Sequence, residues 1–114
     1  MEERTIYDVI IIGSGPGGMT AALYASRANL KTLILEKGVP GGELLNTSDV
    51  ENYPGFSNIS GPDLAENMYK GAMQFGAEYA YGNVSGIEVD GDLRIVHAGK
   101  KSYAAYAVVI ATGS

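Results

Sequence analysis

The chain of 114 residues contains no cysteine and a single histidine, His97. Without cysteine it can form no disulfide, thiolate metal site or redox dithiol of its own, so any electron transfer must be carried by a bound group. One histidine is too few for a His-rich metal site, and we expect no bound metal ion. His97 lies in an alternating segment that predicts a strand, and we interpret it as a surface or structural residue with no acid nearby.

Positive charge and long apolar runs are also scarce. The chain has 8 Lys plus Arg against 13 Asp plus Glu, which gives a net charge of −5. A nucleic-acid surface needs a basic face to meet the phosphates, so we expect no DNA or RNA partner. The apolar run near the N-terminus covers only residues 9–12, and the sequence therefore predicts neither a membrane span nor a signal peptide. We expect a cytoplasmic protein that binds no membrane.

Glycine, in contrast, is abundant, with 16 of 114 residues against an ordinary share of about 7%. Residues 7–12 form an apolar, β-branched run that is typical of a strand buried on both faces of a parallel sheet. A glycine-rich turn follows, and from Pro16 small and apolar residues recur at helical spacing. Residues 32–35 predict a second strand that ends at Glu36. This β-α-β order predicts an α/β fold with a right-handed crossover.

The rest of the chain divides into a loop, a helix and several short strands. Residues 37–60 show no clear period and predict a loop with one helical turn near residues 42–45. Residues 60–76 predict an amphipathic helix that Ser60 caps and Gly76 ends. After it the period changes to two. The predicted strands are residues 78–81, 84–89, 93–98, 102–103 and 107–111, with hairpin turns at Asp90-Gly91 and Gly99-Lys100.

Residues 13–18 read Gly-Ser-Gly-Pro-Gly-Gly and match the pattern G-x-G-x-x-G between a predicted strand and a predicted helix. In such a motif, Gly13 allows the tight exit from the strand, Gly15 lets the backbone approach a pyrophosphate, and Gly18 lets helix and strand pack closely. The N-terminus of the helix offers free N–H groups to the phosphates. Glu36 would accept hydrogen bonds from the hydroxyls of an adenosine ribose and repel a 2′-phosphate. The pattern alone leaves FAD and NAD both open.

Several motifs together resemble the N-terminal part of the FAD domain of low-molecular-weight bacterial thioredoxin reductases, and the resemblance extends over essentially the whole chain. It rests on residues 13–18, 26–30 (Ser-Arg-Ala-Asn-Leu), 41–43 (Gly-Gly-Glu), 50–55 (Val-Glu-Asn-Tyr-Pro-Gly) and 111–113 (Ala-Thr-Gly). It implies a Rossmann-like FAD/NAD(P)-binding fold of the three-layer ββα type, with a small β-meander crossover and incomplete at the C-terminus. It also implies FAD as the cofactor and a homodimer.

The resemblance further implies which residues bind FAD, and it implies no catalytic residue. Gly13, Gly15, Pro16 and Gly17 would surround the pyrophosphate, and Ser14 would also belong to the cofactor site. Glu36 would bind the adenosine ribose, with Lys37 beside it. The ribityl chain and isoalloxazine ring would contact Gly41, Gly42, Glu43, Leu44, Asn46 or Thr47, and Asn52. Val84 would meet adenine through its backbone, and Ala111, Thr112 and Gly113 would pass under the flavin side of the cofactor.

Two features depart from the family pattern. The family commonly has Gln where this chain has Glu43, and a carboxylate beside the flavin would oppose the anionic reduced ring. At ~4 Å and an effective dielectric of ~20 the repulsion is about 4 kcal/mol, so we expect a lowered flavin potential or a Glu43 side chain turned to solvent. The family's Cys-x-x-Cys pair, NADPH domain and C-terminal FAD segment are absent from residues 1–114. We therefore expect an N-terminal portion of a FAD-binding domain that is catalytically incomplete.

The resemblance implies an NADPH-dependent thioredoxin-disulfide reductase, in which electrons pass from NADPH to FAD, to a cysteine pair and to thioredoxin. A ferredoxin or flavodoxin NADP reductase, or the flavin subunit of an alkyl hydroperoxide reductase, is an alternative within the same fold. A nucleotide-binding scaffold without catalysis is the alternative from another class.

Overall fold

The computed structural model describes residues 5–38 and 61–112. Their elements are, in chain order, β1 (Ile6–Ile12), α1 (Pro16–Arg27), β2 (Thr32–Glu36), α2 (Gly61–Met73), β3 (Glu78–Tyr81), β4 (Val84–Asp90), β5 (Leu93–Ala98) and β6 (Lys101–Ile110). The helical turn predicted near residues 42–45 and the cap at Ser60 lie outside the described residues.

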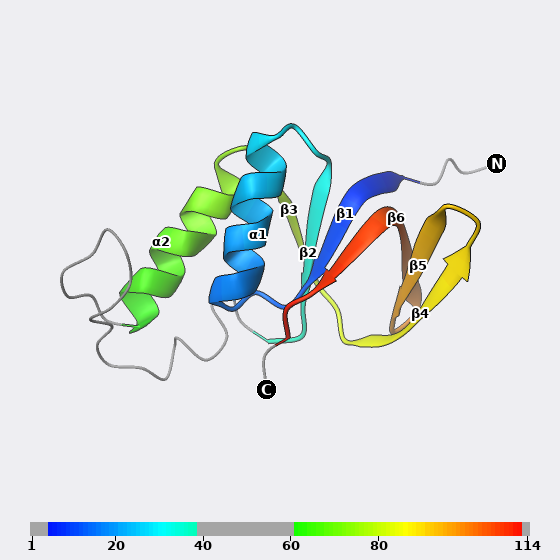
Figure 1. Ribbon diagram of the computed structural model, residues 1–114. Helices are drawn as coiled ribbons and strands as arrows, with labels where there is room; N and C mark the ends of the chain where they lie inside the picture. The colour runs from blue at the N-terminus through cyan, green and yellow to red at the C-terminus, as the bar shows by residue number, and fades with distance from the viewer. Residues whose placement is uncertain (1–4, 39–60, 113–114) are drawn as a thin grey trace.

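One six-stranded sheet has the order β3-β2-β1-β6-β5-β4. Strands β3, β2, β1 and β6 pair in parallel, whereas β4, β5 and β6 form an antiparallel meander. Figure 1 shows α1 and α2 on one side of the parallel strands and the meander on the other side. The predicted three-layer, Rossmann-like α/β fold with a meander crossover is therefore confirmed.

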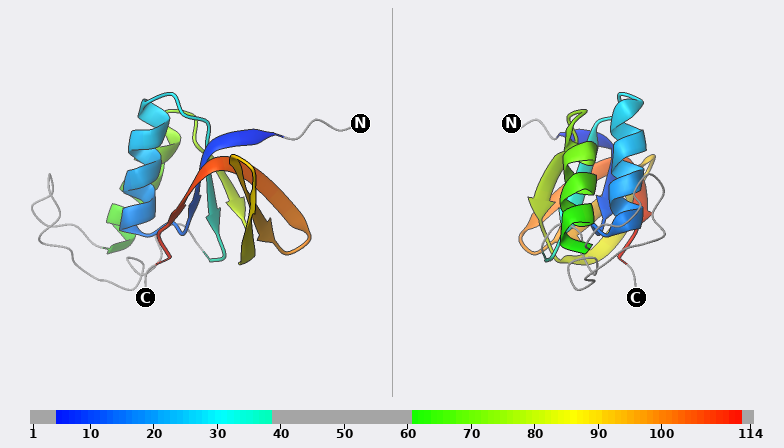
Figure 2. Two further views of the ribbon diagram at one scale, coloured as in Figure 1. Left: turned by 45° about the vertical axis from the view of Figure 1, so that its right-hand side comes forward. Right: turned by 90° about the vertical axis from the view of Figure 1, so that its left-hand side faces the viewer.

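The parallel strands are apolar on both faces because each face is covered by another layer. On the helix side, Val9, Ile11 and Ile34 pack against Met19 and Ala22 of α1. In the views of Figure 2, α1 and α2 lie side by side over this face. Alternate side chains of the apolar run in β1 therefore pack into two hydrophobic clusters, one on each face of the sheet.

The face opposite the helices packs against the meander. Here Ile10, Ile12, Leu33 and Leu35 contact Val96 of β5. The left view of Figure 2 shows how the bend of β6 turns β5 and β4 back towards this face.

Two predictions about the meander are wrong in detail. The strands expected at residues 102–103 and 107–111 are a single strand, β6, because its first half pairs with β5 and its second half with β1. The first hairpin loop is Gly91-Asp92 and not Asp90-Gly91, since Asp90 pairs with Leu93. Gly91 has a φ of 61°, and a glycine in the first loop position is typical of a type II′ turn.

Candidate functional site

The carboxyl ends of three parallel strands meet at one edge of the sheet and position the candidate site. Ile12 pairs with Leu35 on one side and with Ile110 on the other. Backbone hydrogen bonds continue just beyond these pairs. Gly13 N–H donates to the Leu35 carbonyl at 2.8 Å, and Ala111 N–H donates to the Ile12 carbonyl at 2.8 Å. The segments that follow β1, β2 and β6 therefore lie next to one another, as ligand sites of open α/β sheets do.

Two glycines of the glycine-rich segment, residues 13–18, are required by the fold itself. Gly13 has a φ of 104°, and a Cβ on it would stand 2.3 Å from the Ala111 carbonyl oxygen. A Cβ on Gly18 would stand 2.1 Å from the Gly13 carbonyl oxygen. Strand exit and helix packing therefore leave no room for a side chain at either position.

The other two glycines of this segment, Gly15 and Gly17, are not required by packing against the described residues. A Cβ on Gly15 or on Gly17 would meet no atom of the described residues within 4 Å. Gly15 has φ −70° and ψ −172°, which is extended backbone that any residue adopts. The described residues leave space over these two positions, and a ligand that approaches the backbone closely there would explain why both are glycine.

The N-terminus of α1 opens onto the same space. Gly15 is its N-cap, no side chain caps the first turn, and the first turn contains no acidic residue. The first N–H groups of a helix have no partner within the helix, and together they carry about half a positive charge. The turn can therefore receive an anion such as a phosphate.

Glu36, at the end of β2, reaches back to this turn. Its Oε1 accepts hydrogen bonds from Ser14 N–H at 2.9 Å and from Ser14 Oγ at 2.6 Å, and its Oε2 accepts one from Gly38 N–H at 3.1 Å. Burial raises the pKa of the Glu36 carboxyl, but the Ser14 hydroxyl and the backbone N–H groups of Gly38, Ser14 and Lys37 lower it by more. The pKa lies below the ordinary value, so Glu36 carries a negative charge at neutral pH.

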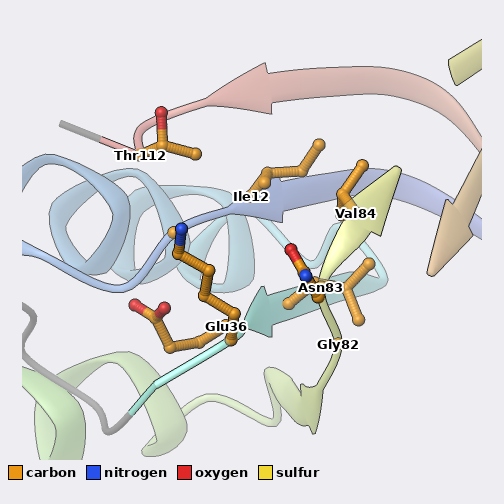
Figure 3. A pocket seen from close by; sticks show the side chains of 9 residues that line it. Ile12, Glu36, Gly82, Asn83, Val84 and Thr112 are labelled. Atoms are coloured by element: carbon orange, nitrogen blue, oxygen red, sulfur yellow. The ribbon is translucent and has the colours of Figure 1, made fainter. Parts of the chain in front are cut away.

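A pocket of about 140 Å³ lies beside Glu36 (Figure 3). It is lined by Ile12, Gly13, Leu35, Glu36, Lys37, Gly82, Asn83, Val84 and Thr112. Apolar side chains from the ends of β1, β2 and the start of β4 form its walls, and the carboxylate stands at its border. Such a pocket suits a flat apolar ring that carries a polar, hydroxylated group on one side.

The structure brings together many of the residues expected to bind a cofactor. Those described are Gly13, Ser14, Gly15, Pro16 and Gly17 in the turn, Glu36 and Lys37 after β2, Val84 at the start of β4, and Ala111 and Thr112 after β6. The others lie outside the described residues: Gly41, Gly42, Glu43, Leu44, Asn46, Thr47, Asn52 and Gly113. The roles of all these residues in cofactor binding, inside and outside the described part, stay predictions.

Sequence reasoning missed the Gly82-Asn83 connection that forms one wall of the pocket. Gly82 N–H donates to the Glu36 carbonyl at 3.0 Å. A Cβ on Gly82 would lie 3.1 Å from Ala98 Cβ, so the connection passes close to β5. A Gly-Asn pair between two predicted strands signals a turn, but only the pairing of β3 with β2 brings that turn to the pocket.

His97 lies in the meander, where one expectation was wrong. Its Nε2 is 2.7 Å from Glu88 Oε1, and its Nδ1 is 2.9 Å from Ser102 Oγ. An acid is therefore close, because the pairing of β4 with β5 places the two side chains on one face. Within residues 5–38 and 61–112, no group of His, Cys, Asp and Glu residues is arranged to hold a metal ion. No helix in the same two segments is long and apolar enough to cross a membrane.

Comparison with known proteins agrees with this geometry. A family model described as pyridine nucleotide-disulphide oxidoreductase matches residues 7–114. The chain is 62% identical over 113 residues to the thioredoxin reductase of Listeria monocytogenes, covering 98% of this chain and 35% of that protein. It is 58% identical over 115 residues to the thioredoxin reductase of Bacillus subtilis, covering 100% and 36%.

Solved structures show the same likeness. The thioredoxin reductase from Streptococcus pyogenes superposes with a TM-score of 0.92 at 53% identity, covering 97% of this chain and 36% of that one. The resemblance to bacterial thioredoxin reductases is confirmed, and the chain spans about 35% of the length of the first of the curated relatives that it matches. Because the family model matches nearly the whole sequence, the chain belongs to the pyridine nucleotide-disulphide oxidoreductase family.

Proposed function

We propose that the site binds the adenosine diphosphate part of FAD, and that the chain is the FAD-binding segment of an NADPH-dependent thioredoxin-disulfide reductase. One observation carries the proposal: among residues 5–38 and 61–112, nothing packs over Gly15 and Gly17 at the start of α1, and their backbone conformation does not require glycine. A diphosphate that approaches the backbone there does explain it.

The neighbouring residues fit the rest of an adenosine diphosphate. The pocket beside the turn has apolar walls for the base, and Val84 is one of the residues that line it. The ionised Glu36 accepts hydrogen bonds and donates none, so it suits ribose hydroxyls and disfavours a 2′-phosphate. These features support FAD, or the adenosine half of NAD, over NADP in this site.

In this arrangement the residues of the chain bind and orient the cofactor. The turn would hold the diphosphate, Glu36 the ribose, and Ala111 and Thr112 would lie towards the flavin side. A bound flavin supplies the two-electron redox chemistry. Within residues 5–38 and 61–112 we assign no acid, base or nucleophile to that chemistry.

Electron transfer from NADPH to FAD, to a cysteine pair and to thioredoxin is part of the proposal and not of this chain, which has no cysteine. The support for this part of the proposal is the similarity to relatives that are named thioredoxin reductase. We propose on the same basis that residues 1–114 form the N-terminal portion of a FAD-binding domain, and that the protein is a cytoplasmic homodimer.

The decisive experiment compares the parent chain with Gly15→Ala. The backbone at Gly15 tolerates alanine, and its Cβ would meet no atom of the described residues, so the variant should fold. Because alanine is a weaker N-cap than glycine, the unfolding temperature should fall by no more than a few degrees. Titration with FAD, followed by flavin fluorescence, should show binding to the parent and at least a tenfold loss in Gly15→Ala. Gly71→Ala is the matched control, since Gly71 also faces open space but lies in α2, and it should bind like the parent.

Two results would overturn the proposal. One is a parent chain that stays colourless and takes up no FAD, which favours the scaffold alternative. The other is a folded Gly15→Ala variant that binds FAD as tightly as the parent, because the added methyl group would then not lie in the ligand's place.

A further inference from the structure

Ser14 contacts Glu36 in a way that a glycine-rich turn does not require. Its backbone N–H and its hydroxyl both donate to the same oxygen, Glu36 Oε1, at 2.9 and 2.6 Å. The Ser14 residue is fully buried, with 0% of its surface exposed. The hydroxyl bond is short, as expected for a bond to an ionised acceptor.

These contacts divide the acceptor capacity of the carboxylate unequally. A carboxylate offers about two acceptor positions on each oxygen. Oε1 uses its two positions on Ser14, while Oε2 accepts a hydrogen bond from Gly38 N–H at 3.1 Å. The hydrogen-bonding capacity that remains for a ligand is therefore on Oε2, and the Ser14 hydroxyl holds the carboxylate against rotation about its last bond.

Tyr79 of β3 lies close to Ser14 and Glu36. Its ring packs edge-on against Tyr69 with the centroids 5.6 Å apart. Its hydroxyl oxygen is buried and has no hydrogen-bond partner among the residues that the structure describes. Burial raises the pKa of Tyr79, the nearby Ser14 hydroxyl lowers it and the charge of Glu36 raises it, with a raised pKa as the result. Tyr79 therefore offers a matched control: its hydroxyl is close to the pair but does not hold Glu36.

We propose that the Ser14 side chain is a positioning residue for ribose recognition: by holding Glu36 Oε1 it presents Oε2 to a nucleotide hydroxyl, and the preference for ribose over 2′-deoxyribose depends on it. This inference rests on the proposed function, because it assigns the specificity of the same site. Ser14 acts through Glu36 and not through contact with the base.

The test measures binding of ADP and 2′-deoxy-ADP to the full chain by isothermal titration calorimetry. The parent should prefer ADP by about tenfold, which is the worth of one hydrogen bond to a charged group. Ser14→Ala should bind 2′-deoxy-ADP like the parent and lose most of the preference for ADP. Tyr79→Phe should keep the full preference. In a Glu36→Gln background, Ser14→Ala should change the preference no further.

A ligand-free measurement supplements the titration. The carboxyl pKa of Glu36, followed by NMR of the carboxyl carbon, should rise in Ser14→Ala and stay unchanged in Tyr79→Phe. If Ser14→Ala does not fold, Ser14→Gly, which also lacks the hydroxyl, takes the place of Ser14→Ala in both measurements.

The outcomes separate this inference from the proposed function. A parent that binds neither nucleotide overturns both. A parent that binds ADP, with a Ser14→Ala variant that keeps the full preference for ribose, overturns only the role of Ser14. An unchanged Glu36 pKa in Ser14→Ala overturns that role as well, whatever the nucleotides do.

Discussion

Replacing each of the two adjacent glycines of the first turn of α1 by alanine should change stability in opposite directions. A Cβ on Gly17 would meet no atom of the described residues within 4 Å, whereas a Cβ on Gly18 would stand 2.1 Å from the Gly13 carbonyl oxygen. The two variants add the same methyl group to neighbouring positions of one helix. The difference between them therefore measures the close contact and not helix propensity.

The magnitudes follow from the contacts. Alanine in place of glycine stabilises a helix by about 0.5–1 kcal/mol, and Gly17→Ala should show this gain because nothing opposes it. Real Cβ atoms essentially never come within 3.0 Å of such an oxygen, so in Gly18→Ala the helix or the turn must move by about 1 Å. The backbone of Gly13 cannot move away easily, because its N–H donates a hydrogen bond to the Leu35 carbonyl. Overpacking of this kind costs about 1–3 kcal/mol, so we expect a net loss of about 1–2 kcal/mol.

Thermal and urea unfolding of the two variants, followed by far-UV circular dichroism, checks the expectation. For a chain of this size, each 1 kcal/mol corresponds to about 4 °C in the unfolding temperature. Gly17→Ala should unfold above the parent and Gly18→Ala several degrees below it. If both variants shift in the same direction, or if Gly18→Ala is as stable as the parent, the steric explanation for glycine at position 18 is wrong.

Three further predictions concern single side chains. Tyr79→Phe removes a buried hydroxyl that has no partner among the described residues, so urea unfolding should show a gain of about 1 kcal/mol, and a loss would contradict it. Glu36 has a folded-state pKa below its ordinary value of 4.5. Its stabilising effect is therefore complete above that pH and is lost as the pH falls through the lowered pKa. Between pH 3 and 7, the unfolding free energy of Glu36→Gln should fall less steeply towards acid than that of the parent. Equal slopes in the two proteins would refute this. Lys70 pairs with Glu66 at 3.0 Å on the exposed face of α2, so Lys70→Gln should cost no more than about 0.5 kcal/mol in the same urea assay, and a cost above 1 kcal/mol would show that the pair matters more.

The first β-α-β unit could be predicted from the sequence because its determinants are local. An apolar run of residues 7–12, a glycine-rich turn and a run with helical spacing each restrict the backbone within a few residues. Gly13 and Gly18 then require the strand, turn and helix to meet closely, as the structure shows. The same residues predict where a diphosphate would bind.

The meander was harder to predict because strand pairing is not local. The segment in the middle of β6 contains Ala104 and Ala105, which favour a strand only weakly. The strand is continuous because these residues pair with β5 on one side and with β1 on the other. In the same way, the pairing of β4 with β5 brings Glu88 to His97, nine residues away in the chain.

The details of the candidate site were decided by tertiary structure. The sequence by itself determined the glycine-rich turn, the acid after the second strand and the α/β order, since each depends on neighbouring residues. Only the folded chain places Ser14 on the carboxylate of Glu36, buries the Tyr79 hydroxyl beside them and brings Gly82 and Asn83 to the pocket. These contacts join residues far apart in the sequence, and their geometry depends on how the sheet pairs and packs, which no local pattern encodes.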